Sequence, residues 1–436
     1  MSTNNRQRRT AKAKQRAKAR SRHRSATDGP FTTRHGPGPA DTTESNTAAA
    51  IGALRRLVVG RMRGRPDPAA ESAFARFPPG CRQAAIDDVA VTVIEQAVDG
   101  HWTPHDLREV ARRRLTAPGS AEYLLGVLAA VTARHDPATV APEWRAELAG
   151  VEPITGCRGW ALGHDLAWDA AASQLVELLS IVLGLPRLQP IIPAPGRWRP
   201  RADDASHVDE RILGKVRGLL AKAESTTFEE EAEALTAKAQ ELMTAYSIER
   251  AVAEADQPAI PRPATRRVWI DAPYVDGKSL LIQQVAAANG CRGVFAKHLG
   301  VVTLVGFAAD LAFVELLSTS LLLQSSRAMR LAGSHIVNGT SRTRSFRQSF
   351  LVAYAARIGE RLRASAGATQ SVATESHGAA VLPVLAARDD AVADRFAELF
   401  PDSVARSVSV SNRAGYGAGR AAADLAQLDA HDGIEQ

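Results

Sequence analysis

Residues 209–249 read DERILGKVRGLLAKAESTTFEEEAEALTAKAQELMTAYSIE, and they predict two helices joined by a tight turn. In the first half, apolar residues recur at the spacing of one helix face: Ile212, Val216, Leu219, Leu220 and Ala223. A flank beside that face is basic, with Arg211, Lys215 and Lys222. The first helix is therefore expected to bury one side and to present positive charge on another.

The second helix is expected to start at Thr227, whose hydroxyl and the carboxylate of Glu230 form a capping box. Carboxylates crowd its first turns between Glu229 and Glu233, where the positive end of the helix dipole favours them. Because the turn is short, we expect the helices to lie antiparallel. The expected buried stripe of the second helix is Ala232, Leu235, Ala239, Leu242 and Tyr246, with Met243 beside it.

The stretches KVRGLLAKAE (215–224) and EEAEALTAKAQELM (230–243) resemble the bacterial family of domains of unknown function DUF2786, most closely its actinobacterial members. Such members are often long, with further domains on both sides. From about residue 266 the chain also resembles the companion domain that commonly follows, DUF7168. The pieces that carry this second resemblance are VTLVGF (302–307), SFRQSF (345–350) and AGRAA (418–422). Neither resemblance implies catalytic residues.

Composition narrows the class of protein. A chain of 436 residues with 45% hydrophobic content is expected to form two or three domains with real cores. Three scattered cysteines, Cys81, Cys157 and Cys291, indicate neither a disulfide framework nor a zinc site. With no apolar signal segment at the N-terminus, we predict a cytoplasmic protein. The most apolar helices, 175–185 and 311–323, are short for a bilayer, so no membrane partner is predicted.

Positive charge is concentrated at the N-terminus. Residues 1–27 hold ten basic residues and no acid, and removing this +10 from the net +7 leaves −3 on the other 409 residues. Such a tail binds DNA or RNA by counterion release without reading sequence. The alternative is a solubilising tail that adheres weakly to RNA. The basic residues are Arg6, Arg8, Arg9, Lys12, Lys14, Arg16, Lys18, Arg20, Arg22 and Arg24.

We predict a predominantly helical α+β fold: an N-terminal all-α domain, a central αα-hairpin, and a C-terminal small β-sheet covered by helices. Proline-rich linkers set the hairpin apart, and we expect it to dock on the α+β domain. The predicted segments are a disordered basic tail and polar linker (1–47), the helical domain (48–185), a linker (186–207), the hairpin (208–250), a second linker (251–265), the α+β domain (266–428) and a disordered end (429–436).

Within the last third, periodicity predicts five strands and several helices. The expected strands are 267–270, 293–296, 301–306, 380–385 and 404–410. The expected helices are 279–288, a buried helix capped by Asp310 that ends near Leu331, 346–362 after a polar loop, 391–400, and a short terminal helix.

No metal or cofactor site is predicted. His101 and His105 are separated by the helix-starting pair Thr103 and Pro104, so they need not share a face. His164, Asp165 and Asp169 are better explained by local helix capping. No nucleophile signature such as Gly-x-Ser-x-Gly is present either.

A glycine cluster offers a candidate anion site. Gly415, Gly417 and Gly419 lie between a predicted strand and a predicted helix, flanked by Arg413 and Arg420. A strand, a glycine loop and a helix N-terminus together cradle phosphate in many proteins. The spacing is neither a dinucleotide fingerprint nor a Walker loop. The alternative is that small residues let this helix pack closely against a sheet.

An arginine-rich helix offers a second candidate. Phe346, Phe350, Tyr354, Ile358 and Leu362 form its core stripe, and the arginines lie off that stripe. Such a face contacts phosphates, here through Arg344 and Arg347, or is solvated, or pairs with the acids of 229–233. The arginines are Arg342, Arg344, Arg347, Arg357, Arg361 and Arg363, against one acid, Glu360.

Two functions follow from these patterns. The favoured one is a non-catalytic protein that associates with nucleic acid or acts as a scaffold, using the tail and the basic helix faces, with a protein partner possible at the charged residues of the hairpin. The alternative is an enzyme of unknown class with its site in the α+β domain. The absence of a recognisable catalytic constellation favours the first.

Overall fold

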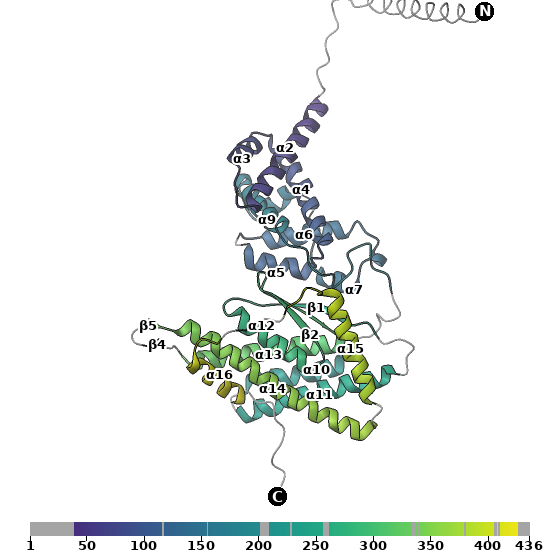
Figure 1. Ribbon diagram of the computed structural model, residues 1–436. Coiled ribbons are helices and arrows are strands. Elements are labelled where there is room, and N and C mark those ends of the chain that lie inside the picture. The colour runs from purple at the N-terminus through teal and green to yellow at the C-terminus, as the bar shows by residue number, and fades with distance from the viewer. Residues whose placement is uncertain are drawn as a thin grey trace, which may run out of the picture. The chain divides into compact units, whose positions relative to one another are not determined.

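The computed structural model describes residues 39–115, 117–154, 156–200, 209–226, 229–255, 261–333, 336–337, 340–378, 381–404, 408 and 410–425. The described chain is predominantly helical with a small antiparallel sheet, which confirms the predicted fold class (Figure 1). It forms two compact units: Met1–Val93 with Thr155–Gly184 (unit 1), and Ile94–Ile154 with Leu185–Gln436 (unit 2). Residues 48–185, predicted as one helical domain, are divided between these units. The predicted basic residues from Arg6 to Arg24 lie outside the described residues.

Unit 1 is built from helices. Leu54, Ile86 and Leu178 are fully buried in it. The Asp87 carboxylate accepts a 2.7 Å hydrogen bond from the amide of Cys157 and so ties two of its helices together. Its elements are α2 (Pro39–Met62), α3 (Pro68–Ala75), the first part of α4 (Pro79–Asp99), α8 (Cys157–Gly163) and α9 (Trp168–Leu183).

The N-terminal part of unit 2 is also helical. It holds α5 (Pro104–Arg114), α6 (Ser120–Thr132), a 3-10 turn (Pro137–Thr139) and α7 (Pro142–Glu147). Helix α5 begins as predicted, because Thr103 caps it and Pro104 occupies its first position. Asp106 completes a capping box with Thr103.

The predicted hairpin is formed by α10 (Glu210–Ser225) and α11 (Glu229–Ala255). Its buried residues Val216, Leu220 and Met243 belong to the same core as the helices that follow, so the hairpin docks on the α+β part as expected. Leu213 is buried where Ile212 and Leu219 are only partly buried, so the buried face is turned by about one residue from the prediction. The predicted cap at Thr227 and the Glu230 side chain lie outside the description.

The sheet consists of β1 (Ala264–Trp269), β2 (Arg292–Ala296) and β3 (Val301–Gly306) in the order β1-β3-β2, all antiparallel. These are the first three predicted strands. Every residue of the central strand β3 is buried. Val302 and Leu304 point to the main core of unit 2, while Val305 on the opposite face packs with Val392 and Leu399. The two edges are β1 and β2.

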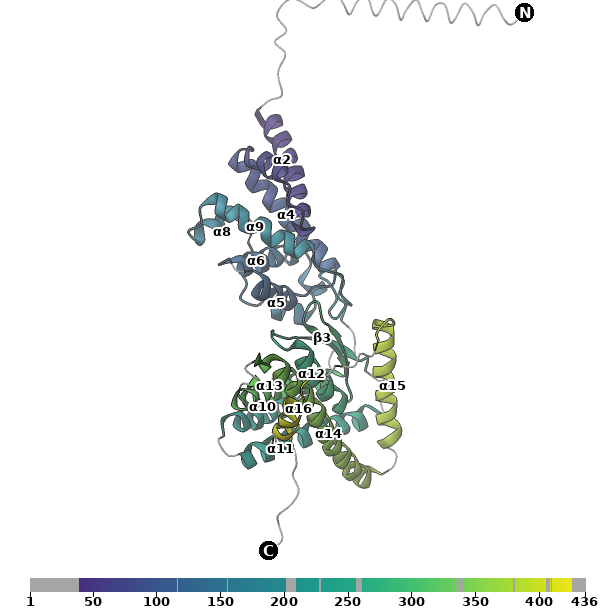
Figure 2. The ribbon, with the colours of Figure 1, turned by 60° about the vertical axis from the view of Figure 1, so that its left-hand side comes forward.

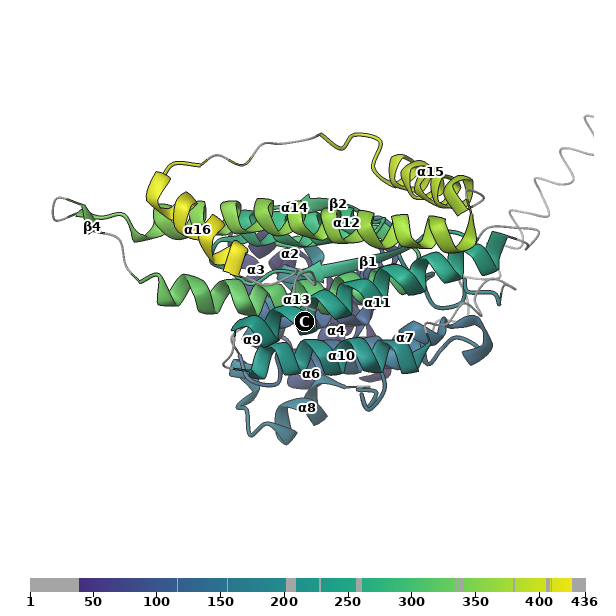
Figure 3. The ribbon, with the colours of Figure 1, turned by 90° about the horizontal axis from the view of Figure 1, so that it is seen from below.

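Five helices complete unit 2: α12 (Val275–Ala288), α13 (Ala308–Leu331), α14 (Thr343–His377), α15 (Val381–Leu399) and α16 (Arg413–Leu425). Seen from below, α14 lies alongside α11 and α12, with α16 crossing one end of it (Figure 3). Helix α15 packs on the face of the sheet that carries Val305 and stands at the right-hand edge of unit 2 in Figure 2. Helix α14 is much longer than the predicted 346–362.

Three predictions about this region are wrong. Residues 381–385 open helix α15 instead of forming a strand, because Pro383 falls in the first turn of a helix, where it is tolerated. In 404–410, the described residues belong to no strand. Phe307, not Asp310, is the N-cap of α13; Asp310 is buried in its first turn, bonded to Ser247 and, at 3.3 Å, to Arg388.

Helix α13 ends at Leu331, as predicted, and begins at Ala308, slightly before the predicted cap. By length and composition it is apolar enough to cross a membrane, as is the bent pair α8 and α9 if it is counted as one span. Leu317 and Leu321 of α13 are fully buried in the core of unit 2, and a buried core helix can be as long and as apolar as a membrane-spanning one.

Candidate nucleic-acid interface

A short β-ribbon extends from one end of unit 2. Strands β4 (Ile336–Val337) and β5 (Thr340–Ser341) pair antiparallel between the end of α13 and the start of α14 (Figures 1 and 3). The sequence prediction was a polar loop. Asn338-Gly339 between two β-prone pairs is a strong hairpin signal and would have identified the ribbon.

Arginines lie on the helix turns that precede and follow this ribbon. Arg327 and Arg330 are exposed on the last turns of α13. Arg342 and Arg344 are exposed at the start of α14, and Arg347 is half-buried one turn later. No carboxylate occurs in the sequence between Glu315 and Glu360. Among the described residues, none of these five arginines forms an ion pair.

The start of α16 adds Arg413 to this group. The Ser349 hydroxyl of α14 accepts hydrogen bonds from the amides of Ser411 (3.3 Å) and Asn412 (3.1 Å), which holds the residue before Arg413 against α14. Arg413 is exposed. The tertiary structure thus brings together residues that the sequence placed in two separate candidate sites. We call this set the arginine arm: Arg327, Arg330, Arg342, Arg344, Arg347 and Arg413.

The predicted glycine loop is wrong, because Gly415, Gly417 and Gly419 lie inside helix α16. A Cβ at Gly415 would lie 2.3 Å from the carbonyl oxygen of Phe346, and one at Gly419 would lie 2.2 Å from that of Phe350. Two of the glycines therefore allow α16 to lie directly on α14, which matches the packing alternative. Arg420 faces Glu360 at 3.4 Å instead of an anion site.

The later arginines of α14 have structural partners. Arg361 is buried and donates to the carbonyl oxygens of Ala423 (2.6 Å) and Asp424 (3.1 Å) at the end of α16. Arg357 bonds to Asp424 and, at 2.9 Å, to Glu360; Arg363 donates to Gln284 at 2.8 Å. Arg342, Arg344 and Arg347, which have no ion pair within the described chain, thus lie at the start of this helix, and the predicted phosphate contact stays a prediction.

The basic flank of the hairpin likewise contains one residue with an acidic partner and two without one in the described chain. Lys222 pairs with Glu231 at 2.7 Å, and this hydrogen bond lowers the pKa of Glu231. Arg211 and Lys215 are exposed and have no ion pair within the described chain. They lie on α10 and not on the arginine arm.

A buried ion pair joins α5 to strand β1. Arg267 and Asp106 are paired with side chains 2% and 0% exposed. The Asp106 carboxylate also accepts from Trp269 Nε1 at 2.9 Å and from the amide (3.1 Å) and hydroxyl (3.0 Å) of Thr103. Arg267 donates to the carbonyl oxygens of His101, at 3.0 Å, and Gln189. Both charges are fully hydrogen-bonded, so this pair is a structural joint.

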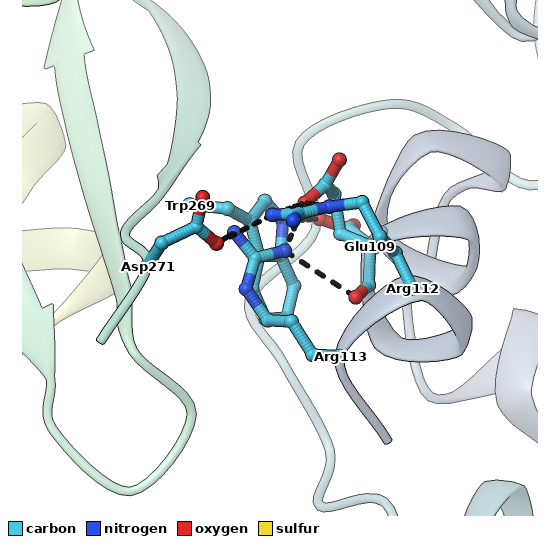
Figure 4. A network of polar contacts seen from close by, with 6 residues as sticks. Glu109, Arg112, Arg113, Trp269 and Asp271 are labelled. Carbon is cyan, nitrogen blue, oxygen red and sulfur yellow. Dashed lines mark hydrogen bonds and ion pairs between the residues drawn. The ribbon is translucent and has the colours of Figure 1, made fainter. Parts of the chain in front are cut away.

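A more exposed network continues from the same joint (Figure 4). Arg112 and Arg113 of α5 lie between Glu109 and Asp271, and the Arg113 guanidinium lies 5.1 Å from the Trp269 ring centre. Burial alone would raise the pKa values of Glu109 and Asp271, but the hydrogen bonds and charges of the arginines outweigh it and lower both.

Beside the joint lies a cavity of about 840 Å³. It is lined by strand β1, the ends of α5 and α7, the start of α13 and the segment around Trp198. Its polar groups include His105, whose amide donates to Glu147 at 2.9 Å. Burial raises the pKa of Glu147. Within the described residues, no group of three or more His, Cys, Asp or Glu is arranged to hold a metal.

Comparison with known proteins identifies the hairpin alone. No curated protein matches the chain. No solved structure matches it either. Residues 211–250 match the model of a family described as protein of unknown function (DUF2786), which confirms the resemblance seen in the sequence of α10 and α11. Helices α10 and α11 are thus a DUF2786 segment within a longer chain.

Proposed function

We propose that this protein associates with double-stranded nucleic acid through the arginine arm, with the basic tail adding affinity. The observation that carries the proposal is that six arginines lie on the end of α13, the start of α14 and the start of α16, the helix ends next to the β-ribbon, and that no carboxylate of the described chain is paired with any of them. Arginines contact phosphate through a fork of donors, and each contact releases counterions.

The shape of the arm favours B-form DNA over duplex RNA. The major groove of B-DNA is about 12 Å wide and admits a two-stranded β-ribbon. The corresponding groove of A-form RNA is too narrow for side chains to read. The arginines on the helix turns next to the ribbon would then contact the phosphates beside the groove. Contacts to phosphates fix the position of a protein on the duplex but do not distinguish bases, so we expect the arginine arm to show little sequence preference.

The remaining expectations from the sequence fit this proposal. A cytoplasmic location suits a protein that binds nucleic acid in a bacterium, and residues 266–428 are proposed to be the companion domain of the DUF2786 hairpin. The shared core of the hairpin and the α+β part supports this pairing. The enzyme alternative gains a cavity, but the Asp106 carboxylate on its wall is fully engaged in the structural joint.

The test separates the arm from the tail. In a tail-neutral chain, the ten Lys and Arg residues of 1–27 are replaced by Gln, and binding to a 20-base-pair DNA duplex is followed by fluorescence anisotropy at several salt concentrations. Adding Arg327→Gln and Arg344→Gln removes two phosphate contacts. We expect the slope of log affinity against log salt to become shallower by about 2.

A matched control replaces Arg217 and Arg292 by Gln in the same tail-neutral chain. Both are exposed and face Glu210 and Asp389, so the net charge changes equally without touching the arm. We expect this control to keep the slope of the tail-neutral chain. If arm and control variants show the same slope, or if the tail-neutral chain binds no duplex, the arm is not the interface.

A further inference from the structure

The 840 Å³ cavity follows the unpaired edge of strand β1. Residues 261–267 all line it, while no residue of β3 does. Successive residues of a strand point to opposite faces, so a cavity bordered by a continuous run contacts the backbone edge and not one face. Since β1 is an edge strand of the sheet, its outer edge pairs with no strand of the described chain.

The register identifies which backbone groups face the cavity. The amide of Ile270 donates to the carbonyl of Gly300 at 2.8 Å, and these residues are opposite each other by continuation of the β1–β3 register. Hydrogen-bonded pairs alternate along an antiparallel ladder, so Thr265 and Arg267 direct their N–H and C=O groups away from β3. No backbone partner for these groups occurs among the described residues.

The charges in the cavity favour a basic ligand. Its arginines are mostly neutralised: Arg262 by Glu398, Arg266 by Glu315 and Arg267 by Asp106. Arg197 faces Asp99, and Arg199 donates to backbone carbonyls. Glu143 and Glu147, one turn apart on α7, pair with no lysine or arginine of the described chain. Glu143 is exposed and Glu147 is half-buried, with the His105 amide as a hydrogen-bond donor to the Glu147 carboxylate. Partial burial still disfavours the charged form of Glu147, and a ligand cation would offset that cost.

We propose that this cavity binds an extended peptide that adds to β1 as a fourth strand and places a lysine or arginine side chain at Glu147. Main-chain hydrogen bonds to Thr265 and Arg267 provide affinity, and Glu147 with Glu143 provides selectivity, the division of roles found in strand addition. Of the lining run 261–267, residues 264–267 belong to β1, so strand pairing in the cavity engages about four residues of the peptide. This site is separate from the arginine arm.

The test uses the tail-neutral full chain and a fluorescein-labelled heptapeptide of alternating threonine and valine with a central lysine. Saturable binding is expected by fluorescence anisotropy. Thr265→Pro removes one outward N–H donor at an edge position where proline is tolerated. We expect it to weaken binding by roughly two- to tenfold, the effect of one hydrogen bond, while Thr265→Ala leaves binding unchanged.

A second experiment tests selectivity by comparing Glu147→Gln with Glu152→Gln. Glu152 is an exposed acid that does not line the cavity. Glu147→Gln should weaken the lysine peptide and leave a peptide with central glutamine unaffected, whereas Glu152→Gln should change neither. A measurement that needs no protein variant uses two peptides N-methylated on alternate sets of amides. Because only one edge of the peptide faces β1, one set should abolish binding and the other should retain it.

Three results would overturn the proposal. One is the absence of saturable binding at peptide concentrations up to about 1 mM. The second is equal loss of affinity with both N-methylated peptides. The third is a dimer of the full chain, seen by sedimentation, that Thr265→Pro dissociates, since β1 would then pair with a second copy of the chain.

Discussion

Replacing Arg267 by methionine tests the joint between α5 and strand β1. The change keeps the length and the apolar stem of the side chain but removes the charge, leaving the 0% exposed Asp106 carboxylate without a counter-ion. Trp269 and Thr103 still donate to it, yet two carbonyl oxygens, those of His101 and Gln189, lose their donor. Both effects destabilise the folded state.

The magnitude follows from the burial of the pair. Removing one partner of a buried ion pair costs about 3–5 kcal/mol, because an uncompensated charge remains in a poorly solvated place. The neighbouring Arg266→Met on the same strand serves as the control, because its ion pair with Glu315 is nearly half exposed. That variant should cost about 0–1 kcal/mol. Urea unfolding followed by circular dichroism measures both differences.

A double variant separates the charge from the packing. Adding Asp106→Asn to Arg267→Met removes the uncompensated carboxylate charge. The double variant should therefore be about 1–3 kcal/mol more stable than the sum of the two single changes predicts. If Arg267→Met and Arg266→Met lower the free energy of unfolding equally, or if the two single changes at 106 and 267 are additive, the pair is not the joint that we describe.

Two further predictions concern close packing and titration. Gly419→Ala should destabilise the fold by about 1–3 kcal/mol, because the new Cβ would press on the carbonyl of Phe350. Gly417→Ala, whose Cβ would have nothing within 4 Å, should instead stabilise α16 by up to about 1 kcal/mol. Thermal unfolding distinguishes the two variants, and equal shifts in melting temperature would contradict the α14–α16 packing. The raised pKa of Glu147 means that the folded chain holds this proton more tightly than the unfolded chain does, so stability is lost as pH rises from the ordinary value of 4.5 through the folded pKa. Glu147→Gln should therefore be more stable than the parent near neutral pH and lose that advantage below about pH 4. A difference in the free energy of unfolding between variant and parent that does not change with pH would refute this.

Much of the fold was predictable because its signals are local. The apolar spacing of α10 and α11 and the proline at the start of α5 set these helices without knowledge of their neighbours. The three strands of the sheet were recognisable from short apolar runs between turns. The strand predicted at 380–385 was wrong because a β-prone run bounded by small residues is equally compatible with a helix start, and packing of Val392 and Leu399 selected the helix.

The candidate sites were less predictable, because they depend on residues far apart in the chain. The sequence by itself determined most of the helices, the three strands of the sheet, the DUF2786 hairpin and the separation of a basic tail from a nearly neutral body. Tertiary structure alone decided that Arg361 is buried as a helix cap while Arg344 stays exposed, that Gly419 is a packing position, and that Arg267 meets Asp106 across 161 residues. Periodicity reports which side of an element avoids water, but the partner that satisfies each charge is set by packing between elements, and no local pattern contains that information.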